Sequence, residues 1–336
     1  TISKAGHNGI MIKGAKSIEA LNNADTFVFD KTGTLTAGEL EVIEVESYDD
    51  KWTTDELLNL TASTEEHYFH PVAEAVVKAA KQRGFVHMHH EEVEFIVAHG
   101  VKTEVNGKSV IIGSRHFLED DEKIDFTEHK EKIENSLKDG KTLLYISYDG
   151  KLLGTITLAD KIRNNNKKAI TKLRKLGVKN IIMLTGDTKQ KAKMIADELG
   201  INEVRAELLP QDKARIVKEL MNEGKKVAFI GDGINDAPAL ISAHVGISMS
   251  RGADIAKATA DISLLKDDIM AVVEAKEYAN KTMNLINNNF NATVGINSCI
   301  LAGATFGIFS PIITAVLHNG TTIGLLFNSI KGVKLN

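Results

Sequence analysis

The sequence predicts an α/β protein in which a parallel sheet is interrupted by a separate α+β domain and followed by a helical hairpin. Three observations lead to this prediction. Short apolar runs that end in aspartate alternate with amphipathic helical patterns. A histidine-rich stretch from about Glu39 to Gly154 breaks that alternation. Residues 282–330 contain no Asp, Glu, Lys or Arg, although the chain before them is richly charged.

Three predicted strands end at the same edge of the sheet. Phe27–Asp30 is a short apolar run followed by a turn-rich segment, and Ile181–Asp187 and Val227–Gly233 repeat this design. Asn166–Gly177 and Lys189–Gly200 have helical patterns that end in glycine, a common residue after a helix. Because active residues of such sheets gather at the carboxyl ends of the strands, we expect the three Asp-bearing loops to lie together.

The interruption is predicted to be an inserted α+β domain. In the hairpin-like piece Thr103–Ser114, Asn106-Gly107 stands between apolar runs and indicates a two-residue turn. Histidines around His90 are candidate metal ligands, but surface histidines beside charges are usually only solvated. The predicted division is residues 1–38 for the start of the parallel-sheet domain, 39–154 for the inserted domain, 155–281 for the remainder and 282–336 for two C-terminal helices.

The uncharged tail is long enough for two membrane spans. Residues 290–309 and 312–330 each approach the roughly 20 residues that a span needs. Lys281 precedes the pair, and Lys331 and Lys334 follow it, which predicts that both outer ends lie in the cytosol. The alternative is a hairpin of buried core helices. The length without a charge favours the membrane.

The overall composition sets further bounds. The chain has 336 residues and a net charge of −4, which gives no reason to expect a nucleic-acid partner. Its single cysteine, Cys299, excludes an internal disulfide and fits a reducing compartment. The chain begins at Thr1 without an apolar signal core, so we expect it to come from the middle of a longer protein.

The segment Asp30–Thr34, D-K-T-G-T, carries the most specific chemistry. A carboxylate at a strand end can attack the terminal phosphate of ATP and form an acyl phosphate. Threonine and glycine let the following loop wrap tightly, so that backbone groups face the phosphate and Mg²⁺. By itself the pentapeptide would also suit an ordinary turn.

Three partner motifs follow in order. In Thr185–Asp187 a hydroxyl and a backbone N–H can hold phosphoryl oxygens. The ammonium of Lys213 would neutralise charge on a transferred group, although a single lysine is usually just a solvated helix residue. Asp232 and Asp236 bring two carboxylates to one strand end, where hard oxygen ligands favour Mg²⁺.

Taken together, these motifs resemble the P-type ATPases. The resemblance rests on DKTGTLT at Asp30, His70-Pro71, TGD at Thr185 and GDGINDAPAL at Gly231, and it covers essentially the whole chain. The His-Pro pair and the two-helix tail resemble the heavy-metal-transporting branch. This implies a haloacid-dehalogenase-like phosphorylation domain with an inserted nucleotide-binding domain, using ATP and Mg²⁺. It also implies a cytoplasmic-membrane protein whose catalytic domains lie in the cytosol.

The resemblance assigns roles to individual residues. Asp30 becomes the aspartyl phosphate, and Asp30, the backbone carbonyl of Thr32 and Asp232 hold Mg²⁺, with Asp236 behind them. The implied catalytic set is Asp30, Lys31, Thr32, Thr34, Thr185, Gly186, Asp187, Lys213, Asn235 and Asp236. The implied nucleotide-binding set is Glu65, His70, Gly100, Gly113, Asp160 and Arg163.

The inserted domain departs from the family pattern. Ala98-His99-Gly100 stands where the family has Gly-x-Gly, and Gly113-Ser114 stands where it has Gly-Asn. Ala98 adds a methyl group beside the expected adenine site, and Ser114 shortens an amide side chain, so ATP binding at reduced affinity is expected. The alternative for His70 is a packing role before Pro71 at the start of an amphipathic helix.

The tail carries the candidate ligands for a transported ion. His318 lies in L-H-N-G-T-T, which resembles the His-Glu-Gly-Thr-like element of divalent-metal pumps, with Asn319 in place of the acid. The predicted ligand set is His318, Thr322, Asn297 and Ser298, which suits Zn²⁺, Co²⁺, Fe²⁺ or Mn²⁺ better than Cu⁺. The alternative for His318 is a hydrogen bond between helices.

The family's remaining transmembrane helices and its actuator domain, with a T-G-E-type loop, are not found in the chain and are its expected partners, together with the lipid bilayer. Two other interpretations stay open. A soluble phosphatase of the same fold usually carries a second Asp two residues after the nucleophile, where this chain has Thr32. An inactive nucleotide-binding fragment is the other, because Ala98 and Ser114 depart from the pattern.

Overall fold

The computed structural model describes residues 2–67, 70–96, 99–137, 141–250 and 254–332. The expectations for Ala98 and Lys334 therefore concern positions outside the described residues. Contacts divide the chain into two compact units, which are described separately below. Unit 1 contains residues 1–35 and 163–336, and unit 2 contains residues 36–162. The predicted domain limits at residues 38/39 and 154/155 remain predictions.

Unit 1 is built on a seven-stranded sheet in the order β1-β13-β12-β11-β2-β9-β10, which confirms the predicted parallel α/β fold. Every adjacent pair is parallel except β1 with β13. The centre is apolar: Val28, Phe229 and Leu184 have no exposed surface. The strands are β1 (Ile10–Ile12), β2 (Thr26–Asp30), β9 (Asn180–Leu184), β10 (Glu203–Arg205), β11 (Val227–Gly231), β12 (Val245–Ser248) and β13 (Ile262–Leu264).

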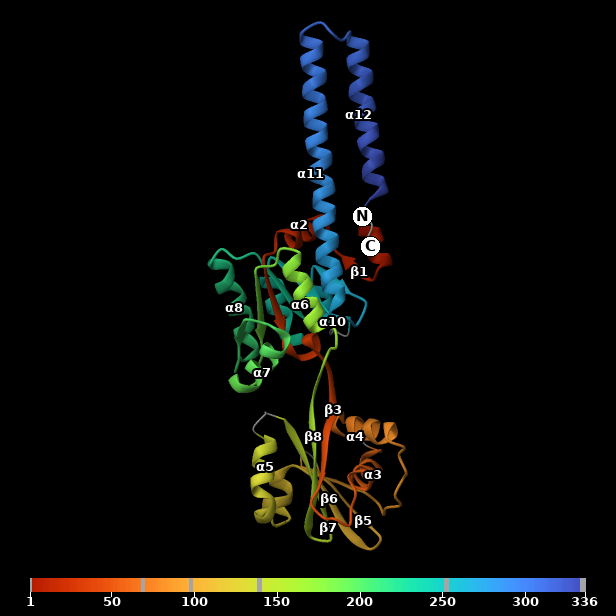
Figure 1. The fold of residues 1–336 in the computed structure, drawn as a ribbon, viewed down its shortest axis with the longest axis vertical. Helices are drawn as coiled ribbons and strands as arrows, with labels where there is room; N and C mark the ends of the chain where they lie inside the picture. The colour runs from red at the N-terminus through yellow and green to blue at the C-terminus, as the bar shows by residue number, and fades with distance from the viewer. Residues whose placement is uncertain (1, 68–69, 97–98, 138–140, 251–253, 333–336) are drawn as a thin grey trace. The chain divides into compact units, whose positions relative to one another are not determined.

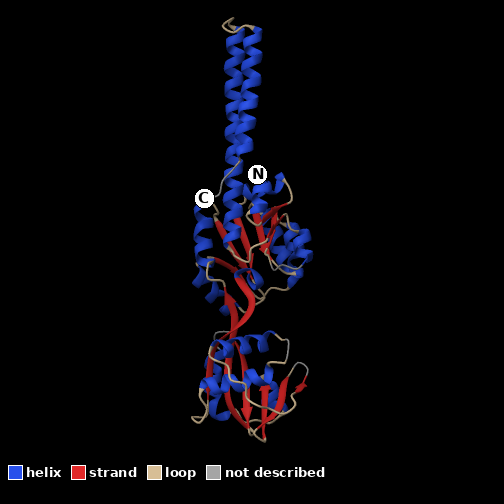
Figure 2. Ribbon diagram, turned by 90° about the vertical axis from the view of Figure 1, so that its right-hand side faces the viewer, coloured by secondary structure: helices blue, strands red, loops and turns tan. Residues whose placement is uncertain are grey.

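Amphipathic helices cover this sheet (Figures 1 and 2). One face of each helix carries the apolar residues at helical spacing, such as Ile216, Val217 and Leu220 of α8, and that face is buried. Gly200 ends α7 in the left-handed conformation, as its sequence position predicted. The helices are α1 (Ile2–His7), α2 (Ala15–Asn23), α6 (Asn166–Lys175), α7 (Lys189–Leu199), α8 (Pro210–Asn222), α9 (Ala237–Ser242) and α10 (Asp254–Thr259).

Unit 2 is a six-stranded antiparallel sheet in the order β3-β8-β7-β6-β5-β4. Alternate residues of one strand serve two cores: Ile112 packs into the core under α3 and α4, whereas Ile111 packs with residues such as Ile133 of α5. The elements are β3 (Thr36–Ser47), α3 (Thr54–Glu65), α4 (Pro71–Gln82), β4 (Glu94–Ile96), β5 (Gly100–Val105), β6 (Lys108–Gly113), α5 (Lys130–Leu137), β7 (Thr142–Tyr148) and β8 (Lys151–Ile162).

The predicted two-residue turn joins β5 to β6. Val105 pairs with Lys108, and the two residues between them, Asn106 and Gly107, both have positive φ angles of 54° and 73°. This conformation suits the right-handed twist of the two strands, and asparagine and glycine adopt it at low cost. The hairpin prediction is confirmed.

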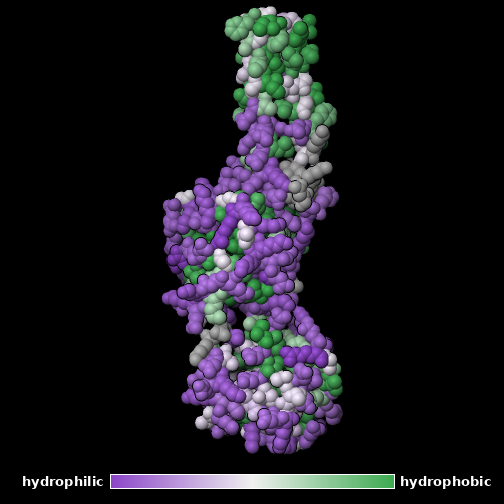
Figure 3. Space-filling model, in the orientation of Figure 1, coloured by the Kyte–Doolittle hydropathy of each residue, from purple (hydrophilic) through white to green (hydrophobic). Residues whose placement is uncertain are grey.

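The tail of unit 1 forms a helical hairpin of α11 (Met270–Thr305) and α12 (Pro311–Lys331), which lie side by side (Figures 1 and 2). Ser310 caps α12 by accepting a hydrogen bond from the backbone N–H of Ile313. Figure 3 shows hydrophobic residues gathered towards the loop end of this hairpin. Exposed apolar side chains there include Phe306, Ile308 and Ile312, which are 70–80% exposed.

The structure bears on the two segments that were predicted as membrane spans. Residues 290–309 and 312–330 are almost entirely helical, as expected. However, within the described part of the chain no helix is both long enough and apolar enough to cross a bilayer.

The first third of α11 is anchored to the sheet domain. It packs on α2 and α6, and Val272, Tyr278 and Ala279 are almost fully buried. Lys276 is also buried, and its ammonium donates hydrogen bonds to three backbone carbonyls at the end of α2, those of Leu21, Asn22 and Ala24, at 2.8–3.0 Å. Burial lowers the pKa of Lys276 to about 8, so the group still carries its charge at neutral pH.

Replacing Lys276 by methionine should therefore destabilise the chain. Lys276→Met keeps an apolar stem but removes one hydrogen-bond donor from each of three carbonyls, of which that of Leu21 keeps the Ala24 N–H, and we expect a loss of about 1–3 kcal/mol of unfolding free energy. The measurement is guanidinium-induced unfolding followed by circular dichroism. The control is Lys266→Met, which changes a half-exposed lysine paired with Glu274 and should cost less than about 0.5 kcal/mol. Equal stability of the two variants would contradict the anchoring role of Lys276.

Candidate active site

The candidate site lies at the carboxyl ends of three adjacent parallel strands. In the sheet, β2 lies between β9 and β11, and Asp30 is the last residue of β2. Thr185 directly follows β9, and Asp232 directly follows β11. Asp30, Asp232 and Asp236 each offer a carboxylate oxygen within 4.8 Å of the others. The structure thus brings Asp30 together with two carboxylates that lie about 200 residues further along the chain, as the strand-end argument predicted.

Lys213 is placed among these carboxylates by the start of α8. Pro210 occupies the first turn, and the side chain of Asp212 accepts a hydrogen bond from the backbone N–H of Leu209 at 3.0 Å, which fixes where the helix begins. The Nζ atom of Lys213 lies 2.7 Å from Asp30 Oδ1 and 2.7 Å from Asp236 Oδ1. One ammonium therefore bridges the candidate nucleophile and the end of the GDGIND loop.

Negative charge remains in excess in this pocket. Burial, followed by repulsion from Asp236, raises the pKa of Asp30 to about 7 against the opposing effect of Lys213. Burial and the same neighbour raise the pKa of Asp232 to about 6. Burial alone would lower the pKa of Lys213, but its two carboxylate partners raise it overall. An additional cation would relieve the repulsion, and a set of carboxylate and carbonyl oxygens fits Mg²⁺.

Asp236 organises its own loop. Its Oδ2 atom accepts hydrogen bonds from the backbone N–H groups of Asp232 (3.3 Å) and Gly233 (3.1 Å), while its Oδ1 atom binds Lys213. This carboxylate is almost fully buried, whereas the neighbouring Asn235 is exposed. Asp236 thus holds the loop that presents Asp232.

Gly33 permits the close approach of the two loops. Its φ angle is 71°, and a Cβ atom added there would lie 1.6 Å from Asp232 Oδ2. Arg163 fastens this loop by donating to the carbonyls of Gly33 (3.0 Å) and Thr34 (2.9 Å), and it pairs with Asp267 at 2.8 Å. Sequence reasoning placed Arg163 at the nucleotide, and it missed Asp267, which no motif marks.

The loop after β9 is joined to the Asp30 loop by an ion pair. Lys31 is buried, and its Nζ atom lies 2.9 Å from Asp187 Oδ2. Thr185 Oγ1 accepts a hydrogen bond from the backbone N–H of Asp187 at 3.1 Å. Thr34 Oγ1 is buried and has no hydrogen-bond partner among the residues that the structure describes. Such an orphaned hydroxyl, next to a predicted phosphate site, is suited to a ligand oxygen.

The predicted nucleotide residues Glu65, His70, Gly100, Gly113 and Asp160 lie in unit 2. Glu65 ends α3, and burial raises its pKa to about 7. His70 caps α4 by accepting the Val72 N–H at 3.3 Å, which matches the helix-start alternative for this residue.

Gly100 and Gly113 face each other on β5 and β6. A Cβ atom at Gly100 would lie 2.1 Å from the Ile112 carbonyl oxygen, and one at Gly113 would lie 2.3 Å from the His99 carbonyl oxygen. Asp160 lies on β8 opposite Leu40. Both glycines are thus required by the backbone packing of this sheet end, whatever ligand it meets.

In the hairpin, two of the four predicted ion ligands meet. His318 Nδ1 and Asn297 Oδ1 are 3.0 Å apart across α11 and α12, which forms the interhelical hydrogen bond considered as the alternative. The hydroxyl of Thr322 donates to the His318 carbonyl at 3.0 Å, and Ser298 is exposed. Sequence reasoning missed a second polar contact, in which Asn328 donates to Asn289 at 2.7 Å.

Comparisons with known proteins identify the family. A family model described as haloacid dehalogenase-like hydrolase matches residues 24–244. The zinc-exporting P-type ATPase of Mycobacterium marinum and the manganese-exporting P-type ATPase of Mycobacterium bovis are each 36% identical over 334 residues, covering 99% of this chain and 46% of each relative. The copper-transporting P-type ATPase of Rhizobium leguminosarum bv. viciae is 37% identical over 330 residues, covering 96% of this chain and 39% of the relative.

A solved structure of a zinc-transporting PIB-type ATPase in its E2.Pi state superposes with a TM-score of 0.88 at 32% identity, covering 98% of this chain and 53% of that chain. The chain thus spans about half the length of the curated relatives it matches. It belongs to the haloacid dehalogenase-like hydrolases. Within them it is a member of the P-type ATPases, in the heavy-metal-transporting branch, and it corresponds to their C-terminal portion.

The raised pKa of Asp30 predicts a pH-dependent stability. The folded pKa of about 7 exceeds the unfolded value of about 3.9, so the folded chain binds more protons between these values and loses stability as pH rises through them. Asp30→Asn removes this loss. In Mg²⁺-free buffer the variant should be more stable than the wild type at pH 8, by on the order of 1–3 kcal/mol, and nearly equal at pH 4.

The measurement is the unfolding free energy of both proteins across pH 4–8. Asp149→Asn, which alters an exposed aspartate paired with Lys108, is the matched control and should show no such trend. A constant difference between Asp30→Asn and wild type at all pH values would contradict the assignment.

Proposed function

We propose that this chain is the catalytic C-terminal part of an ATP-driven pump for a divalent transition-metal ion, which works through phosphorylation of Asp30. The observation that carries the proposal is the bridge from Lys213 to Asp30 and Asp236, beside the carboxylate of Asp232. A buried carboxylate at a strand end that shares a lysine and lies beside two further acids is arranged to receive a phosphoryl group.

The chemistry follows from these contacts. Lys213 binds Asp30 Oδ1, so the attack on the γ-phosphorus of ATP is assigned to Oδ2. The new bond joins this oxygen to phosphorus, the bond between the γ-phosphorus and its bridging oxygen breaks, and ADP leaves. Asp30, Asp232 and the carbonyl of Thr32 would hold Mg²⁺, which supplies charge neutralisation for the transferred group. Lys213 contributes a positive charge to the same group.

The hydroxyls of Thr34 and Thr185 and the backbone N–H of Gly186 are the proposed partners of the phosphoryl oxygens. The residue two positions after Asp30 is Thr32, which cannot act as a general acid or base like the second aspartate of related phosphatases. The acyl phosphate should therefore persist until another part of the pump positions water. This feature favours the pump over a soluble phosphatase.

ATP recognition is assigned to unit 2. Glu65, His70, Gly100, Gly113 and Asp160 are the proposed nucleotide residues, and Arg163 is assigned instead to holding the phosphorylation loop. The raised pKa of Glu65 keeps a large fraction of this buried carboxyl protonated near pH 7, so it can donate a hydrogen bond to a ring nitrogen of adenine.

The hairpin is proposed to lie in the cytoplasmic membrane, with the catalytic units in the cytosol. It exposes apolar side chains such as Phe306 and Ile312, which call for lipid or for the remaining transmembrane helices of the pump. His318 and Asn297 are proposed ligands of the transported ion, with Thr322 and Ser298. Nitrogen and oxygen donors favour Zn²⁺, Co²⁺, Fe²⁺ or Mn²⁺ over Cu⁺. The actuator domain is the remaining proposed partner.

The chain should form an acid-stable, hydroxylamine-labile phosphoenzyme when it is incubated with γ-labelled ATP and Mg²⁺. Asp30→Asn should abolish the label, because an amide cannot form an acyl phosphate, whereas Asp149→Asn should keep it. Label that persists in Asp30→Asn would rule out the proposed nucleophile. Rapid Mg²⁺-dependent release of phosphate from small esters would instead support the phosphatase.

Removing the bridging ammonium should slow phosphorylation without removing the nucleophile. Lys213→Met leaves Asp30 and Asp236 in mutual repulsion and takes one positive charge from the transferred group, so the initial labelling rate should fall at least about 100-fold. Lys218→Met changes an exposed lysine of the same helix and should label normally. Circular dichroism checks that both variants fold. A folded Lys213→Met chain with the wild-type rate would refute this role.

A further inference from the structure

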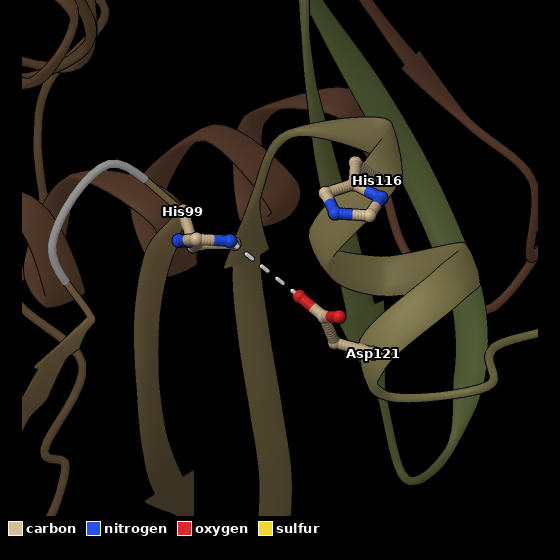
Figure 4. Close-up of side chains that lie close together, drawn as sticks. All are labelled: His99, His116 and Asp121. Carbon is tan, nitrogen blue, oxygen red and sulfur yellow. Dashed lines mark ion pairs between the residues drawn. The ribbon is translucent and has the colours of Figure 1, made fainter.

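Unit 2 carries a second group of potential metal ligands that the proposed function does not use. It consists of His99, His116 and Asp121, each of which offers a ligand atom within 4.8 Å of the other two. Figure 4 shows His99 and Asp121 pointing towards each other, with the ring of His116 on the neighbouring helical turn. We refer to these three residues as the His-His-Asp cluster.

Strand pairing brings the cluster together. His99 directly precedes β5 and His116 follows β6, and these antiparallel strands pair from Gly100 with Gly113 onwards. The backbone of His99 is held at both ends, because its N–H donates to Ile96 and its carbonyl accepts from Ser114, each at 3.0 Å. The short helix Phe117–Asp121 then turns back and presents Asp121. The ligands thus stand on a fixed backbone.

The distance between His99 and Asp121 suits two ligands of one ion. Nε2 of His99 lies 3.7 Å from Asp121 Oδ2, which is too long for a direct hydrogen bond. Ligand bonds of about 2.0–2.2 Å in a tetrahedral zinc site separate nitrogen and oxygen donors by roughly 3.4 Å. Small side-chain movements would therefore bring both atoms onto one ion.

A further carboxylate orients His116. Nδ1 of His116 lies 2.7 Å from Asp120 Oδ2, so in the neutral ring this contact favours the tautomer that carries its proton on Nδ1 and leaves the lone pair on Nε2. Histidines that bind zinc are commonly held in this way by a carboxylate on the other ring nitrogen. In this arrangement Asp120 acts as a positioning residue, and Nε2 is the nitrogen that an ion would meet.

The local charges also favour a cation. Of the four consecutive acidic residues 119–122, the first and last have basic partners: Glu119 pairs with Arg115 at 2.5 Å and Glu122 pairs with Lys102 at 2.8 Å. The ion pairs of Asp120 and Asp121 are made with histidines. When both rings are neutral, the cluster combines two nitrogen donors with the negative charges of Asp120 and Asp121, and a bound cation would balance these charges.

We propose that His99, His116 and Asp121 form a binding site for a divalent transition-metal ion of the Zn²⁺ class, with water as a fourth ligand. A set of two imidazole nitrogens and one carboxylate, with an open fourth position, binds such ions in preference to Mg²⁺ or Ca²⁺. The proposed function places unit 2, which carries this site, in the cytosol. The metal site itself does not depend on phosphorylation of Asp30. It would let a transition-metal ion bind beside the strand ends that carry Gly100 and Gly113.

The test uses the full chain without an affinity tag, in excess Mg²⁺ to fill the carboxylate site of unit 1. Titration with Co²⁺, followed by its visible d–d absorption, reports the ligands directly, and competition with Zn²⁺ reports affinity. His116→Ala and Asp121→Asn should each weaken the site at least tenfold and change the absorption band. Asp120→Asn should weaken it about tenfold while keeping the shape of the band, as expected for a positioning residue.

Two exposed residues provide controls. His7→Ala, on α1, and Asp149→Asn, in unit 2, should leave the band and the affinity unchanged. Circular dichroism shows that each variant is folded. If the wild-type chain gives no cobalt band that zinc displaces, or if folded His116→Ala and Asp121→Asn bind as the wild type does, the proposal is wrong. Loss of phosphoenzyme formation in Asp30→Asn with an intact cobalt band would separate the two sites.

Discussion

The ion pair that one lysine makes with two aspartates is the contact on which the candidate site depends. The Nζ atom of Lys213 lies 2.7 Å from a carboxylate oxygen of Asp30 and 2.7 Å from one of Asp236, so helix α8 is tied to the end of β2 and to the loop after β11. Without a cation, three carboxylates could not share this buried space, because each raises the free energy of ionising the others. The ion pair therefore has a structural and a chemical consequence: it ties the loops together, and it leaves a charged pocket where the phosphoryl group and Mg²⁺ of the proposed function would bind.

Glycine is the second constraint, and it acts in both units. Gly33 lets the Asp30 loop lie against Asp232, where any side chain would collide with the carboxylate. Gly100 and Gly113 let two strand ends approach so closely that backbone atoms occupy the space of a Cβ atom. In unit 1 the glycine allows two loops to pack closely, and in unit 2 the two glycines allow two paired strands to do so. The glycines thus permit these close contacts because they have no Cβ atom, and the neighbouring side chains carry the functional groups.

The long helix α11 links the sheet domain to the hairpin. Its first third is part of the core of unit 1, where Lys276 closes the carbonyl end of α2. Its last third carries Asn297, which contacts His318 on α12. A continuous helix of 36 residues is stiff. Because no flexible linker interrupts α11, a displacement of the sheet domain would also move the hairpin. In a pump this is the connection that coupling requires.

The sequence by itself determined the parallel sheet, the strand-end position of Asp30 and its partners, and the Asn106-Gly107 turn, because apolar periodicity and turn residues act locally. Tertiary structure decided the rest. Arg163 binds loop carbonyls that no side-chain pattern reveals, and Asp267 joins it from about 100 residues away. The His-His-Asp cluster exists because two antiparallel strands end together. Such contacts depend on how the chain packs in three dimensions, and they cannot be predicted from the spacing of residues along the sequence.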